Sequence, residues 1–188
     1  MSGKASVHAS AILVGERAVL IRGPSGAGKS RLAFDLILAG RAGQLPPAIL
    51  VGDDRVYLDT AGEQLWVRPA RELAGLIEIR GLGIRRCAFA AEAVVGLVVD
   101  LAADDAERLP PPEALRIHIN GVLVPRIPVG AGFQPLPLVV AALTTTQSSY
   151  SRNLAADCAK GNGNHITSTI ASDLVGAASP LYRQDQGD

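Results

Sequence analysis

The chain has 188 residues, a length typical of one domain, and 48% of them are hydrophobic while 4% are aromatic. Lysine and arginine number 18 and aspartate and glutamate number 18, so the zero net charge argues against a general nucleic-acid-binding surface. The longest apolar run, Val94–Val99, has the length of a strand, and the first residues lack the apolar segment of a signal peptide. We therefore expect a soluble, cytoplasmic α/β protein that binds neither nucleic acid nor membrane.

The amino-terminal part of the chain alternates apolar runs with turn signals. Ala18–Ile21 predicts a strand that ends in a glycine-rich turn. Ser30–Ala39 carries apolar residues at helical spacing, and Gly40 is the expected end of that helix. Ala48–Val51 predicts a second apolar strand, which is followed by a pair of aspartates.

The next part of the chain predicts two hairpins, a central strand and two helices. In chain order these are a hairpin of Val56–Leu58 and Gln64–Val67, a helix that begins in Arg71–Ile79, a strand at Val94–Val99, a hairpin of Arg116–Ile119 and Val122–Val124, and a helix at Leu138–Leu143. Asn120 and Gly121 give the strongest of the hairpin signals, because both residues tolerate positive φ. Residues 147–188 are poor in large apolar side chains and predict a poorly ordered tail, with at most one weak helix near Ser168–Ala177.

A glycine-rich loop follows the first predicted strand and opens the first predicted helix. The pattern GxxxxGK[ST] is matched in full by Gly23-Pro24-Ser25-Gly26-Ala27-Gly28-Lys29-Ser30. Glycines permit positive φ and a close approach of the backbone to phosphate oxygens, and the loop N–H groups and the helix N-terminus attract negative charge. Lys29 can reach the β- and γ-phosphates, and the Ser30 hydroxyl can join a Mg²⁺ shell. The loop therefore predicts a nucleotide or phosphate site.

A phosphate loop of this kind needs an acidic partner for the metal, and two apolar strands end in aspartate. Asp100 closes the run VVGLVVD, while Asp53 and Asp54 close AILVGDD. Spacing alone does not decide between them, but the doubled aspartates allow one carboxylate to help hold Mg²⁺ while the other accepts a proton. Glu78 precedes a glycine-containing turn, where a glutamate is more often structural than catalytic.

Four motifs occur in order: VHAS at residues 7–10, the GPSGAGKS loop, LVGDD at residues 50–54, and IEIRGLGI at residues 77–84. With these motifs, residues 5–130 resemble the catalytic domain of HPr kinase/phosphorylase. Members of that family use ATP to phosphorylate a serine on HPr, the small phosphocarrier protein of the bacterial phosphotransferase system. The chain looks like a short form without the family's usual amino-terminal domain. The expected fold is a single α/β, P-loop kinase-like domain with a central mixed sheet at residues 1–146, followed by the tail.

The resemblance implies ATP and Mg²⁺ as cofactors and assigns the residues that hold them. Gly23–Ser30 matches the family's ATP loop, with Lys29 on the phosphates. Ser30 and Glu78 match Mg²⁺ ligands, and Asp53 is expected to help with the metal.

The resemblance also implies catalytic roles and an assembly. Asp54 matches the family's proton acceptor in the kinase reaction, and His8 matches a histidine that tunes that carboxylate. Arg108 matches an arginine that precedes a carboxyl-terminal hairpin, whereas Asp100 has no special role in the family. The expected partner is an HPr-type phosphocarrier protein, and the family resemblance suggests a homo-oligomer, specifically a hexamer.

One departure from the family pattern affects the direction of the reaction. The family has a basic loop that is used chiefly in the reverse reaction, whereas residues 128–133 here read PVGAGF and contain no basic residue. We therefore expect the kinase direction to dominate, with Arg126, just upstream, as a candidate replacement cation. Two alternatives stay open: another small P-loop metabolite kinase that uses Asp100 with Arg85 and Arg86 as a basic lid, and a nucleotide-binding regulatory module without turnover.

Overall fold

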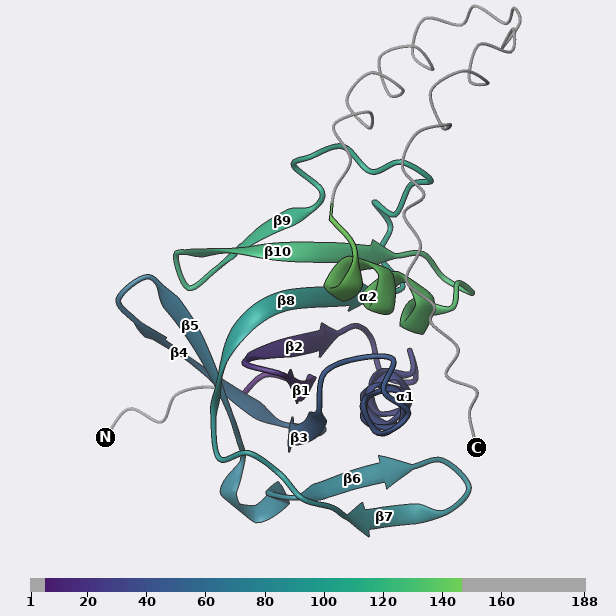
Figure 1. The fold of residues 1–188 in the computed structure, drawn as a ribbon. Coiled ribbons are helices and arrows are strands. Elements are labelled where there is room, and N and C mark those ends of the chain that lie inside the picture. Colours follow the sequence, from purple (N-terminus) through teal and green to yellow (C-terminus); the bar gives the residue numbers. More distant parts are fainter. Residues whose placement is uncertain (1–5, 147–188) are drawn as a thin grey trace, which may run out of the picture. The chain divides into compact units, whose positions relative to one another are not determined.

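A mixed sheet is the centre of the computed structural model, which describes residues 6–146. The strands are β1 (Ser10–Val14), β2 (Arg17–Arg22), β3 (Ala48–Gly52), β4 (Val56–Ala61), β5 (Gln64–Pro69), β6 (Leu76–Ile79), β7 (Gly83–Arg86), β8 (Ala93–Leu101), β9 (Arg116–Ile119) and β10 (Val122–Val129). The helices are α1 (Lys29–Arg41) and α2 (Pro135–Thr144), with a 3₁₀ turn at Arg71–Leu73. The main sheet has the order β3-β1-β2-β8-β10-β9, and the β4–β5 hairpin joins it through β8 (Figure 1).

The four strands that matter for the site point in the same direction. Strands β2, β8 and β10 are parallel to one another, and β3 shares their direction because β3 and β2 are both antiparallel to β1. Their carboxyl ends therefore lie at one edge of the sheet, where ligands of open α/β sheets usually bind. The glycine-rich loop after β2, the aspartate pair after β3 and the end of β8 consequently meet at this edge.

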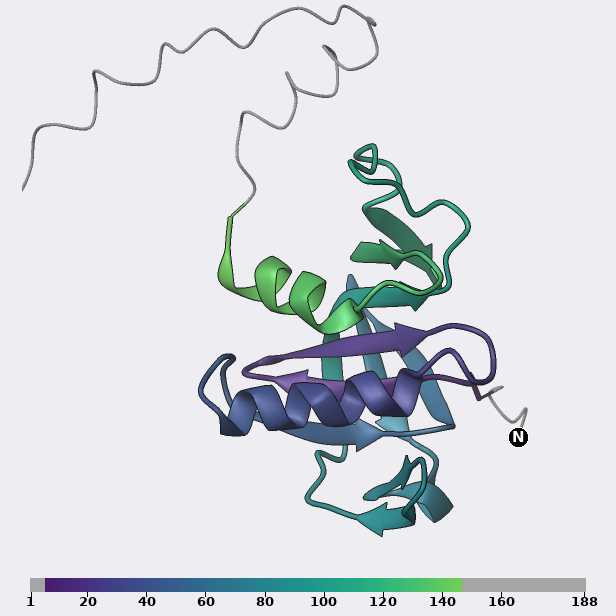
Figure 2. The same cartoon turned by 90° about the vertical axis from the view of Figure 1, so that its right-hand side faces the viewer.

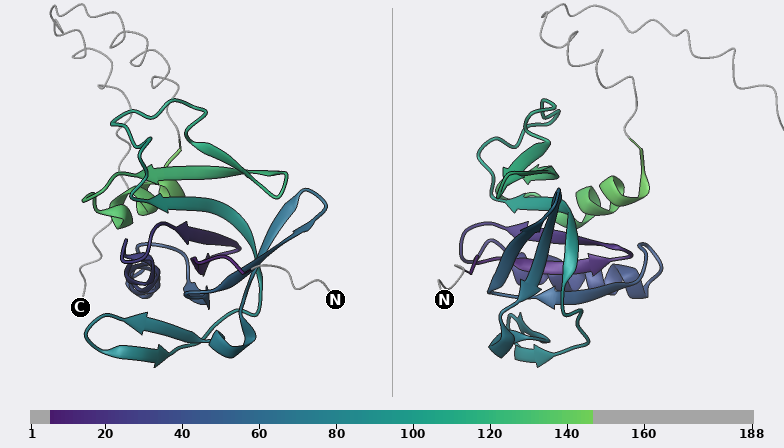
Figure 3. Two further views of the ribbon diagram at one scale, coloured as in Figure 1. Left: turned by 180° about the vertical axis from the view of Figure 1, so that it is seen from behind. Right: turned by 90° about the vertical axis from the view of Figure 1, so that its left-hand side faces the viewer.

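Both faces of the central sheet are covered, which explains why its strands read as continuous apolar runs. In β2, Val19 and Ile21 belong to the core on the α1 side, whereas Ala18 and Leu20 belong to the core on the opposite side. Helices α1 and α2 contribute to the first core, and the β4–β5 hairpin contributes to the second (Figures 2 and 3). The loop and the aspartates are thus held by buried elements, and neither described helix is long and apolar enough to cross a membrane.

Most of the predicted elements are confirmed, including both hairpins. Asn120 and Gly121 have φ angles of 50° and 82°, so the turn that joins β9 to β10 uses the positive φ angles that the sequence indicated. Strand β8 is the predicted central strand and is longer than expected at both ends. The predicted tail and its weak helix lie outside the described residues.

Several local predictions were wrong or incomplete. Arg71–Ile79 is not a helix: a single 3₁₀ turn is followed by Gly75, whose φ is 73°, and the chain then enters β6. Gly40 does not end α1, which continues to Arg41; a Cβ at Gly40 would lie 2.8 Å from the Ala48 Cβ, so this glycine permits close helix–strand packing. Strands β1 and β7 were not assigned from the sequence.

Candidate active site

The loop between β2 and α1 is shaped by glycines with positive φ. The φ angles are 145° at Gly23, 80° at Gly26 and 95° at Gly28, the residue that precedes the first turn of α1. A Cβ at Gly23 would lie 2.8 Å from the Leu101 carbonyl oxygen, so only glycine allows the loop to pass so close to the end of β8. The structure therefore confirms the strand–loop–helix context that a phosphate-binding loop requires.

Lys29 begins α1 and turns its ammonium group back into this loop. Its Nζ donates hydrogen bonds of 3.0 Å to the carbonyl oxygens of Gly23 and Pro24, and the residue is 6% exposed. Burial lowers the pKa of Lys29 below its usual value, and the negative charges of Asp53 and Asp54 offset part of that decrease. The loop thus contains one buried cation that interacts electrostatically with both aspartates of the pair.

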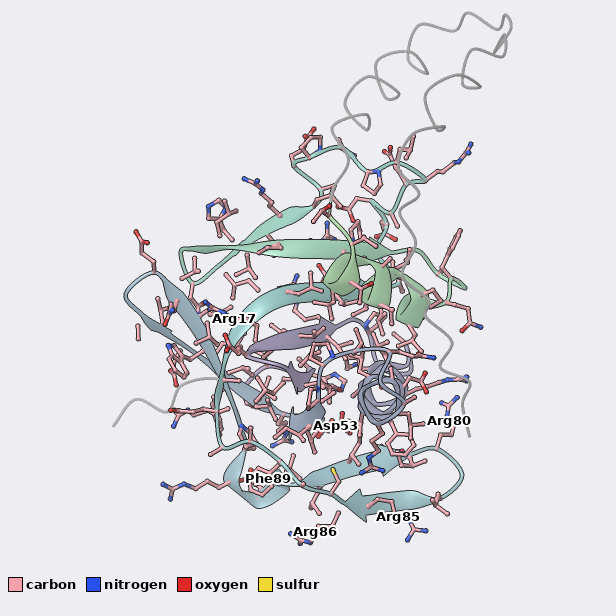
Figure 4. The ribbon with its side chains drawn as sticks, viewed as in Figure 1. Arg17, Asp53, Arg80, Arg85, Arg86 and Phe89 are labelled. Atoms are coloured by element: carbon pink, nitrogen blue, oxygen red, sulfur yellow. The ribbon has the colours of Figure 1, made fainter. Side chains whose placement is uncertain are left out.

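Asp53 is 3% exposed and accepts hydrogen bonds from neutral donors on three different elements. The Ser30 hydroxyl donates to Oδ1 at 3.0 Å, and the backbone N–H of Glu78 donates to Oδ2 at 3.1 Å. The Ser10 hydroxyl of β1 also donates to Oδ1, at 2.5 Å. A buried carboxylate needs such donors, and here they hold Asp53 between the end of β3 and α1 (Figure 4). Among residues 6–146 no lysine, arginine or histidine forms an ion pair with Asp53.

Asp54 has a different environment from its neighbour. Its side chain is 62% exposed, and Oδ1 lies 3.4 Å from Nε2 of His8. The φ of Asp54 is 65°, a left-handed conformation that aspartate adopts more readily than most residues. Of the two consecutive aspartates, Asp53 is therefore buried and Asp54 is open to solvent.

The remaining predicted site residues, Glu78 and Arg108, have fewer contacts with the loop and the aspartate pair. Glu78 enters the site through its backbone N–H, and its side chain is exposed at the neighbouring strand β6. Arg108 is exposed in the segment between β8 and β9; within residues 6–146 it forms no hydrogen bond or ion pair with Asp53, Asp54 or the loop. The structure thus brings Glu78 next to Asp53, and the role of Arg108 stays a prediction.

The other strand-end carboxylate, Asp100, is paired with arginines. Arg22 Nε and Nη2 donate to its two oxygens at 2.7 Å each, and Arg126 Nε donates to Oδ2 at 2.6 Å. Burial would raise the pKa of Asp100, but the hydrogen bonds from Arg22 and Arg126 outweigh burial and lower it. Arg126 also bonds Asp105 through Nη1 and Nη2 at 2.6 and 2.9 Å, so it is already engaged by two carboxylates.

Sequence reasoning missed Ser10 and the arginine pairing of Asp100. Ser10 had a usable signal, because it is the single polar residue of the strand SAILV and follows His8 by two residues. Arg22 and Arg126 each lie in an apolar strand, but only the parallel register of β2, β8 and β10 shows that both reach Asp100.

The oxygen atoms beside the loop fit Mg²⁺. Mg²⁺ prefers oxygen ligands and is usually held by one or two protein groups together with substrate phosphates and water. The Ser30 hydroxyl and the Asp53 carboxylate lie side by side at the loop, with the Glu78 carboxylate on the adjoining strand. Across residues 6–146 no group of three or more His, Cys, Asp or Glu side chains is arranged to hold a metal ion.

The comparisons with known proteins agree on one kind of domain. The family described as "HPr Serine kinase C-terminal domain" matches residues 1–156. Proteins named HPr kinase/phosphorylase from Streptococcus pneumoniae strains Hungary19A-6 and ATCC BAA-255 / R6 are each 32% identical over 189 residues, which cover 93% of this chain and 57% of the relative. The solved structure of the Hpr(Ser) kinase/phosphatase from Coxiella burnetii is 27% identical, with a TM-score of 0.59, and the match covers 83% of this chain and 99% of that one. The chain therefore spans little more than half the length of the pneumococcal relatives.

Proposed function

Because the chain belongs to the family of HPr serine kinase C-terminal domains, we propose that it transfers the γ-phosphoryl group of ATP to a serine of an HPr-type phosphocarrier protein. One observation carries this proposal: the Gly23–Ser30 loop and the Asp53–Asp54 pair meet at the same edge of the sheet, joined by the hydrogen bond from Ser30 to Asp53. A phosphate-binding loop next to one buried and one exposed carboxylate fits phosphoryl transfer to a hydroxyl group.

The loop would bind and orient the triphosphate. Its N–H groups and the amino end of α1 favour negative charge, and Lys29 would exchange its bonds to the loop carbonyls for bonds to phosphate oxygens. Ser30 and Asp53, with Glu78 nearby, would hold Mg²⁺, and the ion would supply positive charge to offset the charge of the phosphates.

Asp54 is the base that we assign to the reaction. The serine Oγ forms a bond to the γ-phosphorus, the bond from that phosphorus to the ADP oxygen breaks, and the serine proton passes to the Asp54 carboxylate. His8, 3.4 Å from Asp54, would position this carboxylate and tune its basicity. Asp53 is unsuited to the same task, because it is buried and Ser10 and Ser30 already donate to one of its oxygens.

The geometry disfavours a metabolite kinase that relies on Asp100. Its oxygens accept hydrogen bonds from Arg22 and Arg126, which neutralise the charge that a metal would need. The suggested basic lid is not supported either: Arg85 and Arg86 are exposed on β7 and point away from Asp53 (Figure 4). A regulatory module without turnover is disfavoured by the exposed base Asp54 with its histidine partner.

The family resemblance also leads us to propose a homo-oligomer, with a hexamer as the specific form, that acts in the cytoplasm on its phosphocarrier partner.

Mass spectrometry after incubation with ATP, Mg²⁺ and a phosphocarrier protein tests the central proposal. We expect one phosphate on one serine, and no modification of a phosphocarrier in which that serine is replaced by alanine. ATP binding without transfer to any phosphocarrier would favour the regulatory module. Transfer to a small metabolite would favour the metabolite kinase.

A further inference from the structure

We infer that Ser10 is a positioning residue that fixes the orientation of the Asp53 carboxylate and, through it, of the Ser30 hydroxyl. The inference rests on the proposed use of ATP with Mg²⁺ and assigns a role to a residue outside the loop, the aspartate pair and the histidine. Ser10 is completely buried, and its hydroxyl donates to Asp53 Oδ1 at 2.5 Å.

The fold places Ser10 opposite Asp53 for a structural reason. Strands β1 and β3 are antiparallel, and Ala11 pairs with Gly52, so the residues one step farther on, Ser10 and Asp53, face each other. The same short segment contacts the second aspartate, because His8 lies 3.4 Å from Asp54. The segment from His8 to Ser10, at the start of β1, therefore contacts both carboxylates of the pair.

A carboxylate at this position needs more than one donor to stay in one orientation. The terminal torsion of an aspartate is soft and roughly two-fold, so a single hydrogen bond leaves its two oxygens free to exchange. Ser10 makes the shorter of the two hydrogen bonds to Oδ1, at 2.5 Å against 3.0 Å for Ser30, and the Glu78 N–H bonds Oδ2 from a different strand. Ser10 and Glu78 therefore fix the plane of the carboxylate from two strands, independently of Ser30.

The fixed carboxylate in turn orients Ser30. A hydroxyl has one proton and two lone pairs, and the Ser30 proton is directed at Asp53 Oδ1 at 3.0 Å. The lone pairs of Ser30 are therefore left for a metal ion at the loop. Residues that orient metal ligands in this indirect way typically change metal affinity by about 10- to 100-fold when they are removed.

The test measures the binding of a fluorescent ATP analogue with and without Mg²⁺. In Ser10→Ala we expect the affinity without Mg²⁺ to stay within about 2-fold of the wild type, while the gain in affinity on adding Mg²⁺ falls by about 10-fold. Ser10→Thr keeps the hydroxyl and should restore most of that gain. An unchanged Mg²⁺ gain in Ser10→Ala, or an equal loss with and without Mg²⁺, overturns the inference.

Two further variants separate positioning from general destabilisation. Ala18→Gly removes a fully buried methyl group of β2 without touching the hydrogen bonds, and should lower stability while leaving the Mg²⁺ gain unchanged. In an Asp53→Asn background, Ser10→Ala should have no additional effect on the Mg²⁺ gain, and additive effects would contradict the inference. Should Ser10→Ala not fold, Ser10→Cys, with its weaker donor, replaces it; an undiminished Mg²⁺ gain there would contradict the inference equally.

The assay contains no phosphocarrier protein, so it distinguishes this inference from the proposed function. A protein that responds to Mg²⁺ as expected but phosphorylates no phosphocarrier would overturn the proposed substrate and leave the role of Ser10 standing. A wild-type chain whose nucleotide affinity does not respond to Mg²⁺ would overturn the role of Ser10 directly.

Discussion

Asp53 directly follows β3 and Asp100 is the penultimate residue of β8, so both lie at the same edge of the sheet, yet the two carboxylates have opposite surroundings. Asp53 accepts hydrogen bonds from hydroxyl and amide groups, which are neutral, whereas Asp100 accepts hydrogen bonds from two arginines. Neutral donors hold a carboxylate in place and leave its charge available to a metal ion or to Lys29. Arginines hold it equally well but neutralise it. An aspartate at the end of an apolar strand is therefore not by that position alone a metal ligand. The hydrogen-bond donors around the aspartate decide whether its charge is available to a metal ion.

The sharpest test of this comparison exchanges one aspartate at each strand end for asparagine. Asp54→Asn should lower kcat for transfer to the phosphocarrier by about 10²- to 10⁴-fold, because the amide cannot accept the serine proton. Asp100→Asn should lower kcat by less than about 10-fold, since Asp100 touches no reacting atom in the proposed mechanism. Both variants would be assayed with ATP and the phosphocarrier under the same conditions. A larger loss from Asp100→Asn would reverse the assignment and favour the metabolite-kinase alternative.

A second test uses Lys29, the cation that interacts with the Asp53–Asp54 pair after β3. The negative charges of Asp53 and Asp54 act on Lys29. Lys29→Ala should lower kcat by about 10²- to 10³-fold, because it removes positive charge from the transferring phosphoryl group. Arg116→Ala, which removes an exposed arginine of β9, is the matched control and should retain activity. Circular dichroism would confirm that Lys29→Ala is folded, and near-normal turnover of that variant would refute the loop assignment.

The sequence was enough to predict the loop, the aspartate pair and most of the strands, because each depends on a local pattern. Apolar runs, a complete GxxxxGK[ST] loop and the Asn120–Gly121 turn are specified by neighbouring residues. The long-range contacts could not be predicted in this way. Nothing local to Arg126 shows that it faces Asp100, because that contact follows from the register between β8 and β10. The helix predicted at Arg71–Ile79 failed for a related reason: β6 forms by pairing with β7, and the pairing outweighs the local helical preference.

The comparison also predicts the favoured direction of the reaction. Arg126 is engaged by Asp100 and Asp105, and residues 130–133 contain no cation, so this loop would not compensate the negative charge of an incoming phosphate. At about 4 Å and an effective dielectric near 20, each pair of like unit charges costs about 4 kcal/mol before Mg²⁺ and Lys29 offset it. We expect pyrophosphate release from the serine-phosphorylated phosphocarrier at millimolar phosphate to be at least about 10-fold slower than the kinase reaction. Comparable rates would show that other groups of this site neutralise the charge of the incoming phosphate without Arg126.

The smallest expected effect concerns stability at the end of β8. Arginine hydrogen bonds keep the pKa of Asp100 below its usual value in the folded chain, so its ionised form stabilises the fold. This contribution is complete above the unfolded pKa, about 3.9, and is lost as the pH falls through the lower folded pKa. Asp100→Asn should therefore lower the free energy of unfolding at pH 7 by about 1.5–3 kcal/mol, the usual range for hydrogen bonds to charged groups.

The difference between wild type and Asp100→Asn should then shrink as the pH falls below about 4. Urea unfolding at several pH values from neutral to strongly acidic measures it, and unchanged urea m-values would show that both proteins unfold from similarly compact states. Asp105→Asn is a useful second variant, because it removes a carboxylate from the same arginine at an exposed position and should cost less stability. If the Asp100→Asn difference stayed constant with pH, Asp100 would contribute by shape and packing alone, and the contrast between a charge left available at β3 and a charge neutralised at β8 would fail.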